Sequence, residues 1–397
     1  MKIDRIDVHN LRFEYAPEHR FQYGGGRCTA RVTTLVAVYT ACGQVGFGSA
    51  YTHPAIAHLV IKHQLEPLLR GRNATDVEAM WRTMYGVTRW YGRKGAAMSA
   101  LGALDTAFWD LRGKARGEPV WAMLGGKGGT CPAYASALLW KDDPAELAAE
   151  AAALVARGFH RVKMRMGKSE AYDTQAVAIV REAIGPDRDM MADAGMRYHV
   201  DLARRVGRAL EAHRVFWFEE PFAPEDLDAY AALRGTVGVP IAAGENEFGV
   251  QGFAELIHRG AVDIVQPDAS RCGGLSEVVR TAHLAGEAGL RFAPHTWSDA
   301  LAVVANAHVV AAMPHGLTVE IDQTGNPFID TLLREPLVVR DGMLDLGDRP
   351  GLGVEPDMSV VDRLRIADPL DVPDGTYSDM VFGAAHLTPA GPYEELS

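Results

Sequence analysis

The sequence is poor in cysteine. Four cysteines occur among 397 residues, and no two of them stand in a C-x-x-C spacing. Such scattered thiols argue against a zinc site or a disulfide framework, and they indicate a reducing compartment. The N-terminus, MKIDRIDVHN, is polar and alternating, unlike a signal peptide. We therefore expect a cytoplasmic protein.

The sequence also lacks basic runs and long apolar runs. Lys and Arg number 40 against 51 Asp and Glu, which gives a formal net charge of −11. This balance argues against a nucleic-acid or anionic-membrane partner. The most apolar helical stretch, residues 301–313, is too short to span a membrane and is broken by Asn306 and His308. What remains is an ordinary globular composition, long enough for a barrel and a smaller domain.

The N-terminal third shows two patterns. Residues 2–50 favour β-structure, because KIDRIDVH alternates with period two and two further strands flank a turn at Cys42. Residues 15–27, which lie between these strands, are predicted to be a polar loop. Residues 55–125 favour helices, and the Ala- and Gly-rich stretch 95–112 predicts a long helix that packs closely against its neighbours.

From Cys131 onward, short apolar runs alternate with amphipathic helical stretches. The runs are CPAYASA, HRVKMRM, DMMAD, VFWFEE, PIAAGE, VDIVQPD, LRFAPH and LTVEID. Eight such runs predict a (β/α) barrel. A doubly wound sheet is the competing fold, but polar residues end nearly every run and not only those at one switch point. The Pro- and Gly-rich tail is expected to return to the N-terminal domain, with residues 375–397 as a loose extension.

Three apolar runs end in carboxylates at one interval. Asp193 and Glu219 are 26 residues apart, and Glu245 follows after another 26. That interval is about the length of one strand, one helix and two short loops. The three carboxylates should therefore converge at one edge of a parallel sheet and repel one another unless a cation lies between them. Hard oxygen ligands suit Mg²⁺, so the pattern predicts a magnesium site.

Two cations precede these carboxylates. Lys163 and Arg165 are two residues apart in a predicted strand, so both side chains should face the barrel interior. They are candidate catalytic groups beside the metal. The alternative is that one of them is only a buried counter-ion for the carboxylates.

Further chemistry follows on the last three strands. Asp268 and His295 end neighbouring strands, where the carboxylate could orient the imidazole as an acid–base pair requires. The alternative for His295 is an ordinary core histidine. Glu320 ends the eighth strand, placed to meet developing charge or a substrate group, with Asp322 as the neighbouring alternative.

At these residues the chain resembles the enolase superfamily and, within it, the mandelate racemase subgroup. The resemblance covers nearly the whole length and is carried by GQVGFG, ALDTAFWDLRGKARGEPVWAMLGG, VKMRMG, FEEP, AGE, QPDASRCGG, PHTW and VEID. It implies an α/β fold: an N-terminal α+β capping domain over a modified (β/α)7β TIM-type barrel. The cap would comprise residues 1–125, with residues 330–397 packing back on it, and the barrel residues 126–329. Homo-oligomers are common in the family, so a homo-oligomer is expected.

The resemblance also implies roles for the site residues. Mg²⁺ would be held by Asp193, Glu219 and Glu245, with Glu220 outside the ligand set. The reaction would begin with removal of a proton α to a carboxylate, with metal coordination stabilising the enediolate. His295 and Asp268 would form the acid–base dyad, and Glu320 would hydrogen-bond the carboxylate or enediolate oxygen.

Two positions depart from the family pattern. Gly195 stands where family members often carry a polar residue. Arg165 stands where the racemase pattern has a second lysine, and a guanidinium with a pKa above ~12 is a poor proton acceptor. Two-base racemisation needs an acceptor on each face, so one face lacks an ordinary base unless Lys163 supplies it.

The substitution favours a dehydratase of a sugar acid, aldonate or aldarate, that yields a 2-keto-3-deoxy acid. His295 would remove the α-proton or protonate the leaving 3-hydroxyl, with Lys163 or Arg165 serving the other face. Substrate contacts are predicted from loops that resemble the family's specificity loops, at Tyr23, Arg27 and His53. Two alternatives remain: a racemase or epimerase of an α-hydroxy or α-amino acid, and a non-catalytic binding protein on this scaffold.

Overall fold

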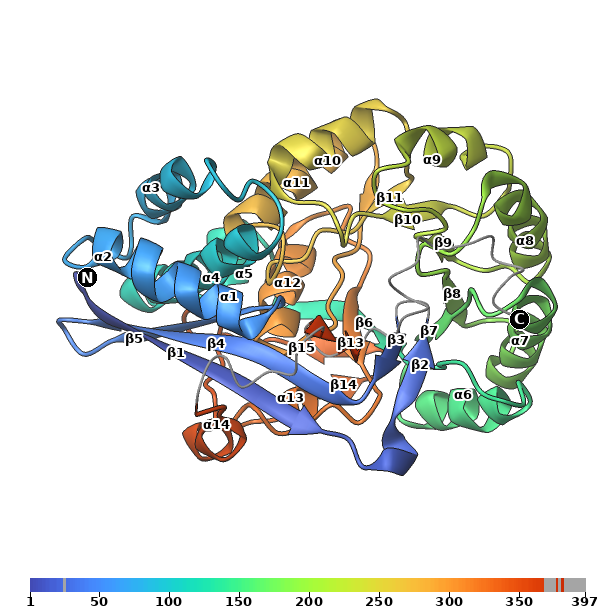
Figure 1. The fold of residues 1–397 in the computed structure, drawn as a ribbon, viewed down its shortest axis with the longest axis horizontal. Coiled ribbons are helices and arrows are strands. Elements are labelled where there is room, and N and C mark those ends of the chain that lie inside the picture. Colours follow the sequence, from blue (N-terminus) through green and yellow to red (C-terminus); the bar gives the residue numbers. More distant parts are fainter. Residues whose placement is uncertain (24–25, 368–375, 378–379, 382–397) are drawn as a thin grey trace.

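The computed structural model describes residues 1–23, 26–367, 376–377 and 380–381. Two parts lie side by side in Figure 1. A blue sheet and its helices form one part, and a ring of helices around short strands forms the other. Within the described residues, no helix is long and apolar enough to cross a membrane.

The cap is built on an antiparallel sheet of three strands in the order β1-β4-β5, with bounds β1 Ile3–Glu14, β4 Ala30–Thr40 and β5 Val45–Ala50. The predicted turn at Cys42 joins β4 to β5. Its helices are α1 Pro54–Leu59, a π-helical turn at Val60–Leu65, α2 Glu66–Leu69, α3 Val77–Thr88 and α4 Ala96–Arg116. The cap therefore has the α+β composition that the sequence predicts.

Close packing of α4 on β5 explains the glycines of GQVGFG. A Cβ added to Gly46 would lie 2.3 Å from the carbonyl oxygen of Ala107, and one added to Gly48 would lie 2.1 Å from that of Ala103. No side chain fits at such distances, so two glycines on the strand and two alanines on the helix allow the backbones to meet. The prediction of a closely packed α4 is confirmed.

The prediction of a polar loop at residues 15–27 is wrong. This segment contains a 3-10 turn, Pro17–His19, and a hairpin of β2 Phe21–Tyr23 with β3 Gly26–Cys28. The prediction of a loose extension is wrong where β16 Thr376–Tyr377 and β17 Met380–Val381 pair with each other and β17 continues onto β3. The remaining residues of that extension lie outside the described part. The hairpin was hidden because each of its strands is only three residues long, and β17, the second partner of β3, is distant in sequence.

The barrel confirms the predicted (β/α)7β order. In the described chain its parallel strands are β6 Thr130–Ser136, β7 Arg161–Arg165, β8 Asp189–Asp193, β9 Trp217–Glu219, β10 Ile241–Ala243, β11 Ile264–Val265, β12 Arg291–Phe292 and β13 Val319–Asp322. The helices between them are α6 Glu146–Ala156, α7 Glu170–Ile184, α8 Val200–Ala212, α9 Leu227–Leu233, α10 Gly249–His258, α11 Leu275–Glu287 and α12 Ala300–Ala312. Strand β13 pairs with β6, and a parallel bridge between Phe292 and Gly316 closes the ring.

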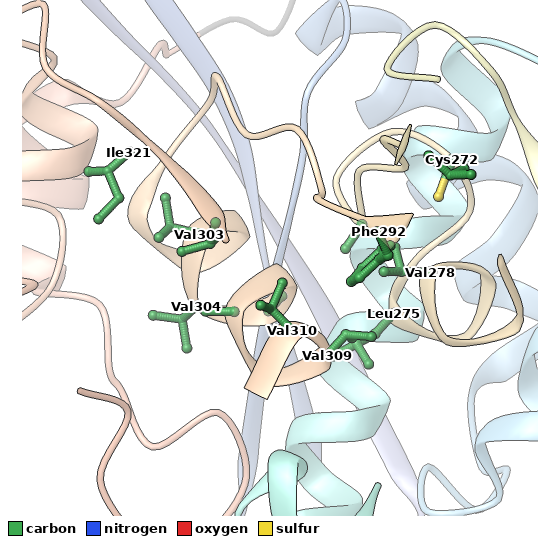
Figure 2. Close-up of a cluster of buried hydrophobic side chains, with 14 of the residues drawn as sticks. Cys272, Leu275, Val278, Phe292, Val303, Val304, Val309, Val310 and Ile321 are labelled. Carbon is green, nitrogen blue, oxygen red and sulfur yellow. The ribbon is translucent and has the colours of Figure 1, made fainter. Parts of the chain in front are cut away.

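The barrel has two apolar layers. Its interior contains a cluster of buried side chains from five strands and from the residue that follows β12: Tyr134, Met191, Trp217, Ala242, Ile264 and Ala293. Outside the strands, α12 packs among its neighbours, and Figure 2 shows its Val303, Val304, Val309 and Val310 with Leu275 and Val278 of α11. Because α12 is surrounded by protein, nearly all of its residues are buried.

The C-terminal part touches both the barrel and the cap. The hairpin of β14 Val339–Arg340 and β15 Met343–Asp345 adds to β6 in antiparallel fashion, and α13 Pro327–Asp330 and α14 Met358–Leu364 flank it in sequence. The amide of Ile366 donates to the carbonyl oxygen of Asn10 on β1 at 2.8 Å. Helix α5 Val120–Met123 precedes the barrel. We retain as a proposal a cap of residues 1–125 with residues 330–397, and a barrel of residues 126–329.

Candidate active site

The predicted carboxylates converge at the C-terminal ends of β8, β9 and β10. Arg165 pairs in register with Asp193, and Asp193 pairs with Glu219, so three adjacent strands end at one level. Glu245 stands two residues beyond β10. Asp193, Glu219 and Glu245 each offer an oxygen atom, and these atoms lie within 4.8 Å of one another.

Lys163 lies among the carboxylates. Its side chain is fully buried, and its Nζ is 2.7 Å from Glu219 Oε1, 2.8 Å from Glu320 Oε1 and 3.5 Å from Asp193 Oδ2. Burial alone would lower the pKa of Lys163, but Glu219, Glu320 and Asp193 outweigh it and raise that pKa. Lys163 therefore holds its proton, and its ammonium neutralises part of the acidic cluster.

Arg165 lies two residues further along β7, as the strand period requires. Its guanidinium forms an ion pair with Asp193, and its Cζ is 4.9 Å from the centre of the Trp297 ring. Burial acts to lower the pKa of Arg165, but Asp193 and Glu245 together raise it. The guanidinium is thus a permanent cation and hydrogen-bond donor at this position.

His295 and Asp268 form the predicted pair. The ring Nδ1 of His295 is 2.9 Å from Asp268 Oδ2, so Nδ1 is the protonated nitrogen. The other nitrogen, Nε2, faces the site, 3.5 Å from Glu245 Oε2 and 4.0 Å from Glu320 Oε2. Burial acts to lower the pKa of His295, but Glu245 and the hydrogen bond that the ring donates to Asp268 raise it to about 9.

Asn306 holds this pair in place, and the sequence reasoning missed it. Its Nδ2 donates to Asp268 Oδ1 at 3.2 Å and to the carbonyl oxygen of His295 at 3.1 Å. Ser270 adds two 2.8 Å hydrogen bonds to the same carboxylate oxygen, from its amide and its hydroxyl. A signal was present, because an asparagine inside the apolar helix α12 needs a buried polar partner.

The structure separates the two acidic candidates on β13. Glu320 lies in the site, where it forms an ion pair with Lys163 and accepts a hydrogen bond from the amide of Thr296 at 2.9 Å. Burial acts to raise the pKa of Glu320, but Lys163 and His295 lower it to about 2. Asp322 instead pairs with Arg31 of the cap. The two carboxylates thus serve different contacts, although they are two residues apart.

Glu220 stands apart from the three converging carboxylates. Its Oε2 accepts from Asn246 Nδ2 at 2.8 Å, and Asn246 Oδ1 accepts from Arg271 at 2.8 Å. Burial and the nearby Glu245 raise the pKa of Glu220. Its backbone has a φ of 36°, which turns the chain after Glu219. Asn246 and Arg271 were not among the predicted site residues.

The converging trio fits a divalent cation of the magnesium type. All three ligand groups are carboxylates, the donors that Mg²⁺ prefers. Glu245 Oε2 is buried and has no hydrogen-bond partner among the described residues. Burial, together with Asp193, Glu320 and Glu245, raises the pKa of Glu219 to about 8 despite the nearby Lys163. A cation between the carboxylates would relieve that repulsion.

Of the three predicted substrate contacts, the structure describes the side chains of His53 and Arg27. His53 is half-buried at the start of α1, and burial lowers its pKa. Arg27 is exposed on β3, and the side chain of Tyr23 lies outside the described part. The segment that holds His53 does reach the site, because the Tyr51 ring stacks on the His295 ring with centroids 6.4 Å apart.

Fold and site together define an enolase-superfamily protein. The chain matches the mandelate racemase and muconate lactonizing enzyme N-terminal domain over residues 15–125. It matches the enolase C-terminal domain-like family over residues 146–360. The protein therefore belongs to the mandelate racemase and muconate lactonizing enzyme family, as the motifs predict.

Known relatives cover nearly the whole chain. D-galactarolactone cycloisomerase of Agrobacterium fabrum is 35% identical over 381 residues, which are 93% of this chain and all of the relative. Arabinonate dehydratase of Saccharolobus solfataricus is 33% identical over 80% of this chain and 86% of its own. The crystal structure of a racemase from Streptomyces coelicolor A3(2) with bound magnesium has a TM-score of 0.85, with 29% identity. It covers 92% of this chain and 100% of that one. The first two relatives are thus named for reactions of a sugar lactone and of a sugar acid.

Proposed function

We propose that the protein is a Mg²⁺-dependent acid-sugar dehydratase. Asp193, Glu219 and Glu245 would hold the metal. When bound, the cation would coordinate the substrate carboxylate and stabilise the negative charge that develops there. The arabinonate dehydratase relative supports the substrate class and the reaction.

The observation that carries the proposal is the asymmetry between the two sides of the site. The ammonium of Lys163 lies 2.7 Å from Glu219 and 2.8 Å from Glu320, so Lys163 is held as a cation. The guanidinium of Arg165 forms an ion pair with Asp193 and is a poor proton acceptor. Burial acts to lower the pKa of His295, but Glu245 raises it to about 9, and a cation held by Glu245 would remove that cause. His295, oriented by Asp268, is then the group whose ring can accept a proton and return it. One group that exchanges protons suffices for elimination, whereas two-base racemisation needs a second acceptor.

The site residues provide for a β-elimination in which His295 moves the proton. Nε2 of His295 takes the α-proton, and the electron pair of that C–H bond forms the C2–C3 double bond as the C3–O bond breaks. The same ring returns the proton to the departing hydroxide, which leaves as water. Lys163, which Glu320 holds at 2.8 Å, would donate to the carboxylate end, and Arg165 would supply positive charge across from His295. The resulting enol tautomerises to the 2-keto-3-deoxy acid.

A library of aldonates and aldarates tests the proposal. With Mg²⁺, we expect at least one acid to give a 2-keto-3-deoxy product, and EDTA should abolish its formation. His295→Asn should reduce the rate by about 10²–10⁴, the range typical of a lost general base. The proposal fails if no acid is dehydrated while some substrate exchanges its α-proton with solvent and inverts. Elimination at near wild-type rate in His295→Asn would overturn the assigned dyad.

A cycloisomerase is the second candidate, because the relative that matches over its whole length has that name. If the β-oxygen belongs to a ring, the same α-proton removal and C–O cleavage open the ring without loss of water. The product is then an isomer of the substrate. Mass spectrometry of products from sugar lactones and anhydro acids separates the two candidates, since only dehydration lowers the mass by one water.

A further inference from the structure

Trp297 lies between two arginines. It follows His295 by two residues and is 2% exposed. The Cζ of Arg31 is 4.5 Å from its ring centre, and the Cζ of Arg165 is 4.9 Å from it. Both distances lie within the range of cation–π contacts, so one indole binds one guanidinium from the cap and one from the barrel.

Each arginine is anchored at its own end. Arg31, on β4 of the cap, forms a buried ion pair with Asp322 at the end of β13. It also donates to the hydroxyl oxygens of Thr324 at 3.1 Å and Tyr15 at 3.3 Å. Arg165 pairs with Asp193. The chain of contacts therefore runs from the cap, through the indole, to a carboxylate of the proposed metal site.

Besides the two arginines, the indole has apolar neighbours. Trp297 forms a small buried cluster with Tyr51 and Leu139, and Phe21 packs against it. Tyr51 also stacks on His295 at an interplanar angle of 26°. Exclusion of water strengthens a cation–π contact. A displacement of Trp297 would therefore release Arg165 on one side of the site. On the other side it would loosen the packing of Tyr51, the ring that stacks on His295.

The indole gives a physical reason for arginine at position 165. A planar guanidinium stacks on an aromatic face while its edge still donates to a carboxylate. A lysine ammonium is a point charge with a preference for water, and it cannot combine the two contacts in the same way. Arg165 makes both kinds of contact, since it is ion-paired with Asp193 and its Cζ lies over the Trp297 ring at 4.9 Å from the ring centre.

We propose that Trp297 is a positioning residue that holds Arg165 in place, and that Arg31 holds Trp297. The contact between the cap and the barrel thereby sets the position of the Arg165 guanidinium, which lies opposite His295. This inference rests on the proposed function only for the part that Arg165 plays during turnover.

A double-mutant cycle tests the inference. Trp297→Leu should lower kcat at least tenfold in the wild-type background and less than twofold in the Arg165→Met background. Trp109→Leu is the matched control, because Trp109 is also buried and lies 5.1 Å from a guanidinium carbon, that of Arg112. Its effect should be the same in both backgrounds. Trp297→Phe keeps an aromatic ring for Arg165 and should retain at least half of the wild-type kcat, which separates loss of the ring contact from general damage to the fold.

Mn²⁺ binding to the same variants gives a readout without turnover. Removal of the indole takes away the contact that holds Arg165 over the ring but leaves its ion pair with Asp193, so Arg165 competes more strongly with a cation for that carboxylate. Trp297→Leu should then weaken Mn²⁺ affinity at least threefold, with no change in the Arg165→Met background. Arg31→Met should weaken it in the same direction. Equal effects in both backgrounds, or none in either, overturn the inference. A failure to dehydrate any acid overturns only the proposed function, because the Mn²⁺ cycle still decides this one.

Discussion

Replacement of Lys163 by methionine tests the electrostatics of the site most directly. The Nζ of Lys163 neutralises three buried carboxylates, with 2.7 Å to Glu219 and 2.8 Å to Glu320. Methionine fills a similar volume but leaves those charges without their central cation. Loss of one partner from a buried ion pair costs about 3–5 kcal/mol, because the other charge stays desolvated. We expect a loss of that size in the stability of the metal-free protein.

Thermal unfolding with EDTA and with Mg²⁺ measures the effect. Lys141→Met removes a partly exposed ion pair with Glu150, whose atoms are 2.8 Å apart, and should cost less than about 1 kcal/mol. Magnesium at 100 times its Kd should stabilise a folded variant by about 2.7 kcal/mol, so it should recover much of the loss in Lys163→Met. In EDTA, Lys163→Met should unfold at a lower temperature than Lys141→Met, and magnesium should raise its unfolding temperature. Equal unfolding temperatures in EDTA, or no rise with magnesium, would show that Lys163 does not neutralise the acidic cluster as described.

Three further outcomes follow from particular contacts. Asp268→Asn should lower kcat by about 10²–10⁴ and leave Mn²⁺ affinity within twofold, because it disturbs the imidazole and not the ligands; a large change in affinity would contradict this. Burial lowers the pKa of His308 from 6.5 to about 4. The unfolded chain therefore takes up a proton first as the pH falls, so the stability contributed by the neutral ring is complete above pH 6.5 and is lost toward pH 4. The loss is about 3 kcal/mol, and His308→Asn should show a flatter pH dependence in denaturant titrations. Gly46→Val should destabilise the fold by about 1–3 kcal/mol or more, because its Cβ would lie 2.3 Å from the carbonyl oxygen of Ala107. Gly43→Ala is the control, because its Cβ would meet no atom within 4 Å. It should cost only about 1–2 kcal/mol, for the φ of 86° at that position.

The convergence of the site residues was accessible from the sequence because it depends on backbone period. A strand alternates its side chains, so Lys163 and Arg165 had to share a face. Parallel strands end at one edge, so Asp193 and Glu219 had to meet. Neither inference requires knowledge of how side chains pack, and both agree with the contacts found.

The contacts that surround these residues depend on side-chain packing across the fold. Asn306 was visible as a polar interruption of an apolar helix, but its partner Asp268 is 38 residues away. The hairpin at residues 21–28 lacks a long alternating run, so propensity alone favours a loop there. Arg31 and Asp322 are 291 residues apart and belong to different parts of the molecule. No local pattern relates such residues.

Arg165 shows how the two kinds of information combine. Its chemistry, read from the sequence, removes an ordinary proton acceptor from one side of the site. The structure adds that the guanidinium is ion-paired with Asp193 and lies over the Trp297 ring, so it is held as a fixed charge. A fixed charge can stabilise a departing oxygen or an anionic substrate, and it costs no rearrangement when the charge develops. That property serves elimination, from an open chain or from a ring, better than it serves inversion at a carbon centre.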